Sequence, residues 1–114
     1  MIKNGDKVVA RKVRWCTTPW QRFLGQRCKK NLREGEATIF LGKKETKLNM
    51  TVDMLFVFAP LDIIWLDSKK KIVDIKKGVL PFTPWIVPKK KAKYMIELRK
   101  GKAESLKEED TLSF

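Results

Sequence analysis

Alternating apolar and polar residues are clearest over Ala92–Arg99, "AKYMIELR". Successive side chains of a β-strand point to opposite faces of a sheet, so this pattern predicts a half-buried strand. A shorter alternation over residues 36–41 predicts another strand. The polar residues 42–47 that follow it predict a turn.

A long apolar run, "MTVDMLFVFAPLDIIWL", occupies residues 50–66 and contains Pro60. Proline lacks a backbone donor and breaks a helix, so the run predicts two strands, 52–58 and Leu61–Leu66. Both segments are apolar on both faces, which is typical of strands in the centre of a sheet.

Two hairpins are predicted from turn signals between strand-like segments. Asn4-Gly5-Asp6 separates apolar-containing segments at 2–3 and 7–13, and Asn-Gly is a strong signal for a two-residue hairpin turn. Farther along, the polar residues 67–70 predict a turn that leads from the second half of the apolar run into a strand over 71–77.

Residues 17–25, "TTPWQRFLG", carry signals for a short helix at both ends. Thr18 suits the N-cap, a proline follows at the first helical position, and Gly25 suits the left-handed residue that ends a helix. Trp20 and the apolar residues at helical spacing after it predict a face buried in the core. The alternative is that Trp20 and Arg22 line the rim of a binding pocket.

The last third of the chain is predicted to hold three further segments. Residues 78–88 contain three prolines, which predicts an extended loop or a sheet edge. Residues 101–107 predict a short helix with Ala103 and Leu106 facing inward, and residues 111–114 predict a closing strand.

Together these elements predict a mainly β fold. Many short strands, separated by turns every eight to twelve residues or so, are typical of a β-sandwich or barrel. A chain of 114 residues fits one domain, so residues 1–114 are expected to form a single compact β-sandwich or barrel-like domain with one or two short helices.

Charge adds a candidate function to this fold. Lysine and arginine total 26 against 13 acidic residues, which gives a net charge of +13. Lysine runs either occupy separate solvated turns or attract an anionic partner such as nucleic acid, phospholipid or an acidic protein. Arginine is scarce, which argues against sequence-specific DNA recognition, and the lysine-rich, histidine-free composition suits a thermophile. The candidate anion-binding residues are Lys69, Lys70, Lys71, Lys89, Lys90 and Lys91.

Composition also bears on compartment and metal binding. No apolar run reaches the ~18 residues of a membrane span, and the N-terminus lacks the apolar stretch of a signal peptide, so a cytoplasmic location is expected. Cys16 and Cys28 are expected to be free thiols there, with pairing as the alternative. Two cysteines and no histidine predict no metal site, and no cofactor motif is present.

Catalytic residues are not marked out by any motif. The absence of histidine excludes a histidine base and a serine–histidine triad. No phosphate-binding glycine loop and no nucleophile elbow is present. The sequence therefore predicts no catalytic residue and favours a protein that is not an enzyme.

Asp62 is the carboxylate with two competing interpretations. It stands in an apolar strand, where a carboxylate needs hydrogen bonds or a cation. It either caps backbone donors at the start of the strand or faces a ligand. In the second interpretation the candidate ligand pocket consists of Trp20, Arg22, Asp62 and Trp85.

Three blocks of sequence resemble the family called domain of unknown function 192 (uncharacterised protein family 0127). These are "TPWQRFLG", "PLDIIWLDSKKKIVDI" and "AKYMIELRKGKAESLKEEDTLSF", in the family's order and spacing. The resemblance implies a compact, mainly β domain and carries no established activity. Trp20, Gly25, Asp62 and Gly101 match family positions, whereas Gln26-Arg27-Cys28-Lys29 replaces the usual continuation of the first block.

Three functions are compatible with these observations. The first is a non-catalytic binding module for an anionic partner, such as nucleic acid bound without sequence preference. The second is a small-ligand protein or enzyme with a site near Asp62. The third is an accessory domain that binds another protein through an exposed patch or sheet edge around residues 82–87.

Overall fold

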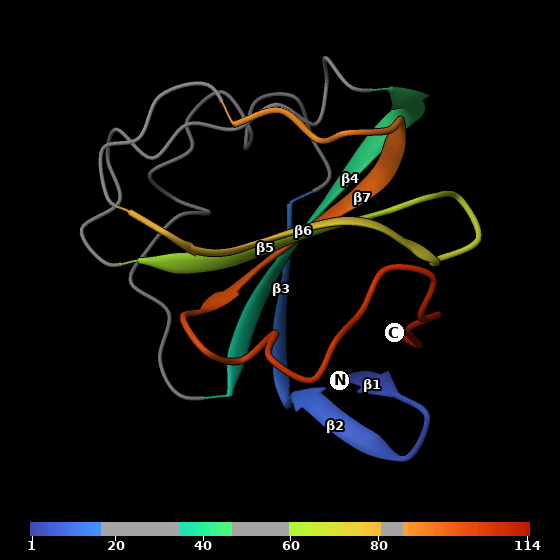
Figure 1. Ribbon diagram of the computed structural model, residues 1–114. Helices are drawn as coiled ribbons and strands as arrows, with labels where there is room; N and C mark the ends of the chain where they lie inside the picture. Colours follow the sequence, from blue (N-terminus) through green and yellow to red (C-terminus); the bar gives the residue numbers. More distant parts are fainter. Residues whose placement is uncertain (17–34, 47–59, 81–85) are drawn as a thin grey trace.

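Seven strands in two sheets make up the regular structure of the part of the chain that the computed structural model describes, residues 1–16, 35–46, 60–80 and 86–114 (Figure 1). One sheet has two strands and the other has five, paired in the order β3-β4-β7-β5-β6. The strands are β1 (Ile2–Asn4), β2 (Lys7–Ala10), β3 (Lys12–Cys16), β4 (Glu36–Thr46), β5 (Leu61–Leu66), β6 (Ile72–Val79) and β7 (Ala92–Arg99).

The five-stranded sheet is mixed, because β3 runs parallel to β4 while every other neighbouring pair is antiparallel. Its two inner strands β5 and β7 match the predicted bounds Leu61–Leu66 and Ala92–Arg99. All six residues of β5 are buried, which confirms the prediction of a central strand. Strands β3 and β6 form the two edges.

Both faces of the large sheet are covered, so apolar residues pack in two clusters. Alternate residues of β7 enter different clusters: Met95 faces one, and Ile96 and Leu98 face the other. The prediction that β7 is half-buried is therefore wrong, and its polar set includes Glu97, which is only 1% exposed. The first cluster also contains Phe40, Leu61, Ile63, Trp65, Val73, Ile86 and Ala92, and the second Ile2, Ala10, Ala37, Ile39, Ile64, Leu66, Ile72, Ala103, Leu106 and Leu112.

The N-terminal hairpin is confirmed, with its turn one residue later than the Asn-Gly pair suggests. Asn4 pairs with Lys7, so Gly5 and Asp6 form the two-residue turn. Gly5 has φ +62°, as the first central residue of a type II′ turn requires. The predicted strand over 7–13 is broken at Arg11, where the chain passes from β2 into β3 and the large sheet.

The second predicted hairpin, β5–β6, is also confirmed. Leu66 pairs with Ile72 across the connection. In the turn, Asp67 Oδ1 accepts hydrogen bonds from the backbone N–H groups of Lys69 (2.9 Å) and Lys71 (3.0 Å). An aspartate that bonds its own downstream backbone in this way fixes the turn, and Lys70 takes φ +65° within it.

The polar turn predicted over 42–47 is wrong, because β4 continues through this segment as far as Thr46. Leu41 pairs with Tyr94 and Thr46 with Ala92. Between these pairs β4 has more residues than β7, so this stretch of β4 is irregular and bulged. Extended pairing with β7 therefore overrides the local turn preference of glycine and lysine.

In the C-terminal region the residues predicted to be buried are buried, but the predicted helix and the predicted strand are not formed. Ala103 and Leu106 are buried as expected, but residues 101–105 form consecutive turns in place of a helix. The predicted closing strand over 111–114 is reduced to two isolated bridges, Lys71 with Thr111 and Lys3 with Ser113. Figure 1 accordingly shows the C-terminal segment close to β1.

The mainly β fold class is confirmed, and its compactness agrees with a radius of gyration of 12.5 Å, against about 13 Å expected for a folded chain of this length. The predicted helix at 17–25 and the predicted strand at 52–58 lie outside the described residues. So does Cys28, and the prediction of free thiols stays a prediction, as does the division into one domain.

Candidate functional site

Asp62 lies in β5, and its carboxylate accepts three hydrogen bonds from backbone donors. It is 1% exposed. Oδ1 accepts the N–H of Gly78 at 2.8 Å, and Oδ2 accepts those of Gly101 at 3.0 Å and Ala103 at 2.9 Å. These bonds join the end of β6 and the turn after β7 to the start of β5, as the capping interpretation predicts.

The candidate ligand pocket cannot be assembled around Asp62 from the described residues. Trp20, Arg22 and Trp85 all lie outside them, so the pocket stays a prediction. Within the described residues the two carboxylate oxygens of Asp62 already accept three hydrogen bonds from the chain itself. These three hydrogen bonds account for the burial of the carboxylate without a ligand or a cation.

The two candidate lysine runs approach the same acidic segment. Lys71 Nζ lies 3.4 Å from Glu109 Oε2, and Lys89 Nζ lies 2.7 Å from Glu108 Oε1. The segment is held against the edge strand β6, because the Glu109 N–H donates to the Ile72 carbonyl at 2.9 Å. Residues separated by some twenty positions in the sequence therefore meet at one edge of the sheet.

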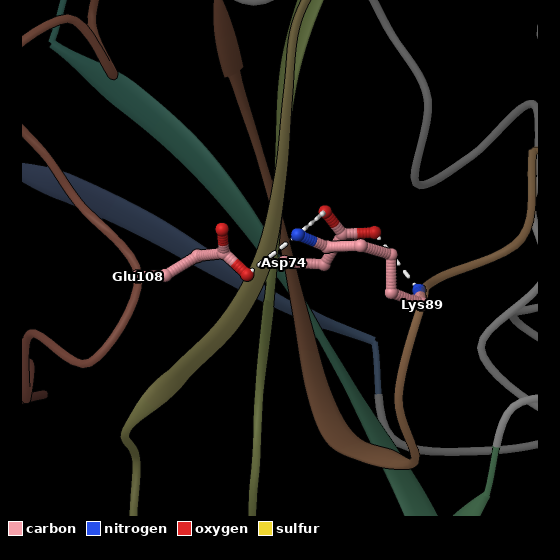
Figure 2. Close-up of polar contacts among 3 residues, drawn as sticks. All are labelled: Asp74, Lys89 and Glu108. Atoms are coloured by element: carbon pink, nitrogen blue, oxygen red, sulfur yellow. Dashed lines mark hydrogen bonds and ion pairs between the residues drawn. The ribbon is translucent and has the colours of Figure 1, made fainter.

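Lys89 connects this edge to a second carboxylate, Asp74, whose side chain is 5% exposed (Figure 2). The backbone N–H of Lys89 donates to Asp74 Oδ2 at 2.9 Å, and its ammonium group lies 3.8 Å from Asp74 Oδ1. The hydrogen bond to Glu108, helped by the charges of both carboxylates, raises the pKa of Lys89 above its ordinary value, although partial desolvation opposes the shift. The Lys89 side chain is thereby held across β6.

The six candidate lysines divide into two groups. Lys71 and Lys89 form the ion pairs just described, and Lys70 Nζ donates to the Phe114 carbonyl at 2.7 Å. The remaining three, Lys69, Lys90 and Lys91, are exposed to solvent. The edge therefore combines lysines fixed in position with lysines that project into water. We call the six lysines together with Glu108 and Glu109 the β6-edge surface.

A row of polar residues across β7, β4 and β3, buried at Glu97 and Thr38 and exposed at Arg14, was not predicted from the sequence. Glu97 in β7 lies opposite Thr38 in β4, and Thr38 lies opposite Arg14 in β3. Directly opposed residues share a face, so the three form one row across the sheet. The alternation over Ala92–Arg99 places Glu97 on the polar side of the strand, and the sequence signal for its burial is the apolar Met95, two residues earlier on the same face.

An exposed aromatic residue also went unrecognised. Trp15 in the edge strand β3 is 43% exposed, in contrast to the fully buried Trp65. Its ring centroid lies 5.8 Å from that of Phe114, which in turn makes an edge contact with Tyr94 at 5.2 Å. The apolar and polar residues around Trp15 alternate over too few positions to distinguish a buried face of the strand from an exposed one.

In the part of the chain that the structure describes, no group of three or more cysteine, aspartate and glutamate side chains is placed to hold a metal ion. No helix found there is long and apolar enough to cross a membrane.

The sequence of the chain matches a known protein family. The sequence profile of DUF192, described as Uncharacterized ACR, matches residues 1–114. The chain belongs to the DUF192 family. This confirms the resemblance seen in the three sequence blocks, and it adds no activity, because the function of DUF192 is not established.

Curated relatives of this DUF192 chain come from thermophilic archaea. A UPF0127 protein of Thermococcus sibiricus is 36% identical over 101 residues, which cover 87% of this chain and 62% of the relative. A UPF0127 protein of Pyrococcus furiosus is 34% identical over 102 residues, covering 88% and 82%. A relative from Thermococcus kodakarensis is covered to 60%, so the chain spans about three fifths of the length of the first relatives it matches.

Two solved structures share the DUF192 chain's fold. A protein of unknown function from Novosphingobium aromaticivorans superposes with a TM-score of 0.79 at 20% identity, covering 90% of this chain and 74% of its own. A candidate transcription regulator from Sinorhizobium meliloti superposes with a TM-score of 0.77 at 21% identity, covering 89% and 79%. At this level of identity the likeness is one of fold.

Proposed function

We propose that this DUF192 chain is a non-catalytic binding module for a polyanion, and that the β6-edge surface is where the polyanion binds. The observation that carries the proposal is the meeting of the two lysine runs at neighbouring residues, Glu108 and Glu109. The sequence left open whether the runs lie on separate sides of the molecule. Their shared acidic neighbours support one continuous surface.

The ion pairs at this surface do not block a polyanion from binding. Both glutamates are substantially exposed, as are the side chains of Lys71 and Lys89. Exposed ion pairs contribute only about 0–1 kcal/mol each, so phosphate groups can replace the glutamates at little cost. The net charge of +13 favours the encounter and makes it salt-dependent.

Nucleic acid is the polyanion we propose to test first. The Sinorhizobium meliloti neighbour is named as a candidate transcription regulator, which points to nucleic acid for that protein. Scarce arginine favours contact with phosphates over reading of base edges, so the proposed binding is without sequence preference. A cytoplasmic location is part of the same proposal.

Fluorescence anisotropy with a mixed-sequence DNA duplex tests the proposal. Affinity is expected to fall steeply between about 50 and 200 mM salt, because binding to phosphates releases counterions. The triple variant Lys69→Ala/Lys90→Ala/Lys91→Ala should bind more weakly, with a salt slope reduced by up to about 0.9 per lost phosphate contact.

A charge-matched control locates the surface. Lys12, Lys77 and Lys100 are exposed residues at the opposite end of the large sheet, near the start of β5. Replacing these three by alanine removes the same charge and should weaken binding much less. Equal losses in the two triple variants, or no binding at about 50 mM salt, would contradict the proposal.

A further inference from the structure

Trp15, Tyr94 and Phe114 form an aromatic cluster that is partly open to solvent. The Phe114 ring lies between the other two, with centroid distances of 5.8 Å to Trp15 and 5.2 Å to Tyr94. Trp15 is 43% exposed although it contacts Phe114. Its strand, β3, is an edge of the sheet with β4 as its neighbour, so the cluster lies at the border of the fold.

A lysine of the first run lies directly on this cluster. Lys70 Nζ is 4.3 Å from the centroid of the Phe114 ring and donates to the Phe114 carbonyl at 2.7 Å. Lys3 pairs with Ser113, the residue before Phe114, and is exposed. The aromatic cluster is therefore bordered by cations, and through Lys70 and Lys71 it is continuous with the β6-edge surface.

We infer that this aromatic cluster binds single-stranded nucleic acid by stacking an unpaired base on Trp15 while the neighbouring lysines contact its phosphates. The inference rests on the proposed function and names the form of polyanion the surface prefers. Proteins that bind single strands without sequence preference combine a basic path for the backbone with aromatic rings for the bases. Trp15 is 43% exposed, so part of its ring is accessible to a base.

The exposed indole ring favours single-stranded nucleic acid over a duplex. In a duplex the bases are already stacked on each other and present only their edges in the grooves. A single strand exposes base faces, which an indole can cover. Lysines alone would favour the duplex for its higher charge density, so a preference for the single strand is the specific signature of the aromatic cluster.

Anisotropy with three labelled probes of equal length tests this inference: oligo-dT, oligo-U and a mixed-sequence duplex. Wild-type protein should bind both single strands more tightly than the duplex at the same salt concentration, and the first two probes distinguish DNA from RNA. Trp15→Leu keeps an apolar side chain and removes the aromatic face. It should lower single-strand affinity by about fivefold or more and leave duplex affinity within about twofold.

Trp15→Phe and Lys90→Ala serve as controls. Phenylalanine retains a stacking face, so Trp15→Phe should recover most of the single-strand affinity lost in Trp15→Leu. Lys90→Ala should weaken single strand and duplex by similar factors. Thermal melting checks that the variants are folded, and folded Trp15→Leu with wild-type single-strand affinity would overturn the inference.

The outcomes also distinguish this inference from the proposed function. If the duplex binds as tightly as the single strands and Trp15→Leu affects neither, the polyanion surface stands and the stacking role is wrong. If no nucleic acid binds at about 50 mM salt, both are wrong. Trp15-dependent binding to anionic phospholipid vesicles in the absence of oligonucleotide binding would assign the cluster to a lipid surface and also overturn the inference.

Discussion

The carboxylate of Asp62 accepts a hydrogen bond from the backbone of Gly101, a residue 39 positions later in the chain, at 3.0 Å. Together with the bonds from Gly78 and Ala103, it fixes how the chain leaves β6 and β7. A carboxylate suits this position because it only accepts, and the three backbone N–H groups bonded to it donate.

Asp62→Asn should therefore destabilise the fold. The amide NH2 faces the N–H of Gly78 in one orientation and those of Gly101 and Ala103 in the other, so at least one hydrogen bond is lost and at least one buried donor is left without an acceptor. The free energy of unfolding should fall by roughly 2–4 kcal/mol. Urea denaturation measures it, with Asp6→Asn in the exposed hairpin turn as a control expected to change by less than about 0.5 kcal/mol. A loss below about 1 kcal/mol for Asp62→Asn would count against the capping role.

Gly101 is expected to resist substitution for a backbone reason. Its φ is +93°, which L-residues rarely adopt, and a Cβ placed there would meet no atom within 4 Å. Gly101→Ala should cost about 1–3 kcal/mol through strain alone. An unchanged urea midpoint in Gly101→Ala would show that the turn relaxes to another conformation.

Ile64 tests the two-sided packing of the central strand. It is fully buried in the second cluster, in a strand flanked on both sides. Ile64→Ala should lower stability by about 2–5 kcal/mol, whereas Ile64→Val should cost about 0.5–1.5 kcal/mol. Val8→Ala, at a 38% exposed position, is the matched surface truncation and should cost far less. Similar losses for Ile64→Ala and Val8→Ala would contradict the described burial.

The ion pair between Lys89 and Glu108 should make the stability of the fold depend on pH. A lysine whose pKa is raised by folding stabilises the folded state below its ordinary pKa of about 10.4, and this contribution disappears as the pH rises through the folded pKa. Carbon-detected NMR of the Lys89 side chain should show a titration midpoint above that value. Glu108→Gln should move the midpoint down, and an unchanged midpoint would mean that the ion pair is not formed in solution.

The sequence predicted those parts of the fold that depend on local pattern. The bounds of β5 and β7 followed from an apolar run ended by Pro60 and from strict alternation. The hairpin turns followed from glycine and aspartate chemistry. In each case the residues that determine the element lie within it or next to it.

What could not be predicted depends on distant parts of the chain. Residues 101–105 form turns in which Gly101 takes a non-helical φ of +93°, and they are held in place by Asp62, far away in sequence, which accepts the N–H groups of Gly101 and Ala103. Glu97 is buried because the second face of the sheet is also covered. The approach of the two lysine runs depends on where Glu108 and Glu109 pack against β6, which no local pattern encodes.

The central claim, that the lysine runs form one polyanion-binding surface, is tested most directly by mapping amide chemical shifts during titration with oligo-dT at about 50 mM salt, where phosphate contacts are strong. Shift changes are expected to be concentrated at residues 69–71, 89–91 and 108–109, together with a shift of the indole N–H of Trp15. Changes concentrated instead around Lys77 and Lys100 at the other end of the sheet, or no changes at all, would contradict the claim.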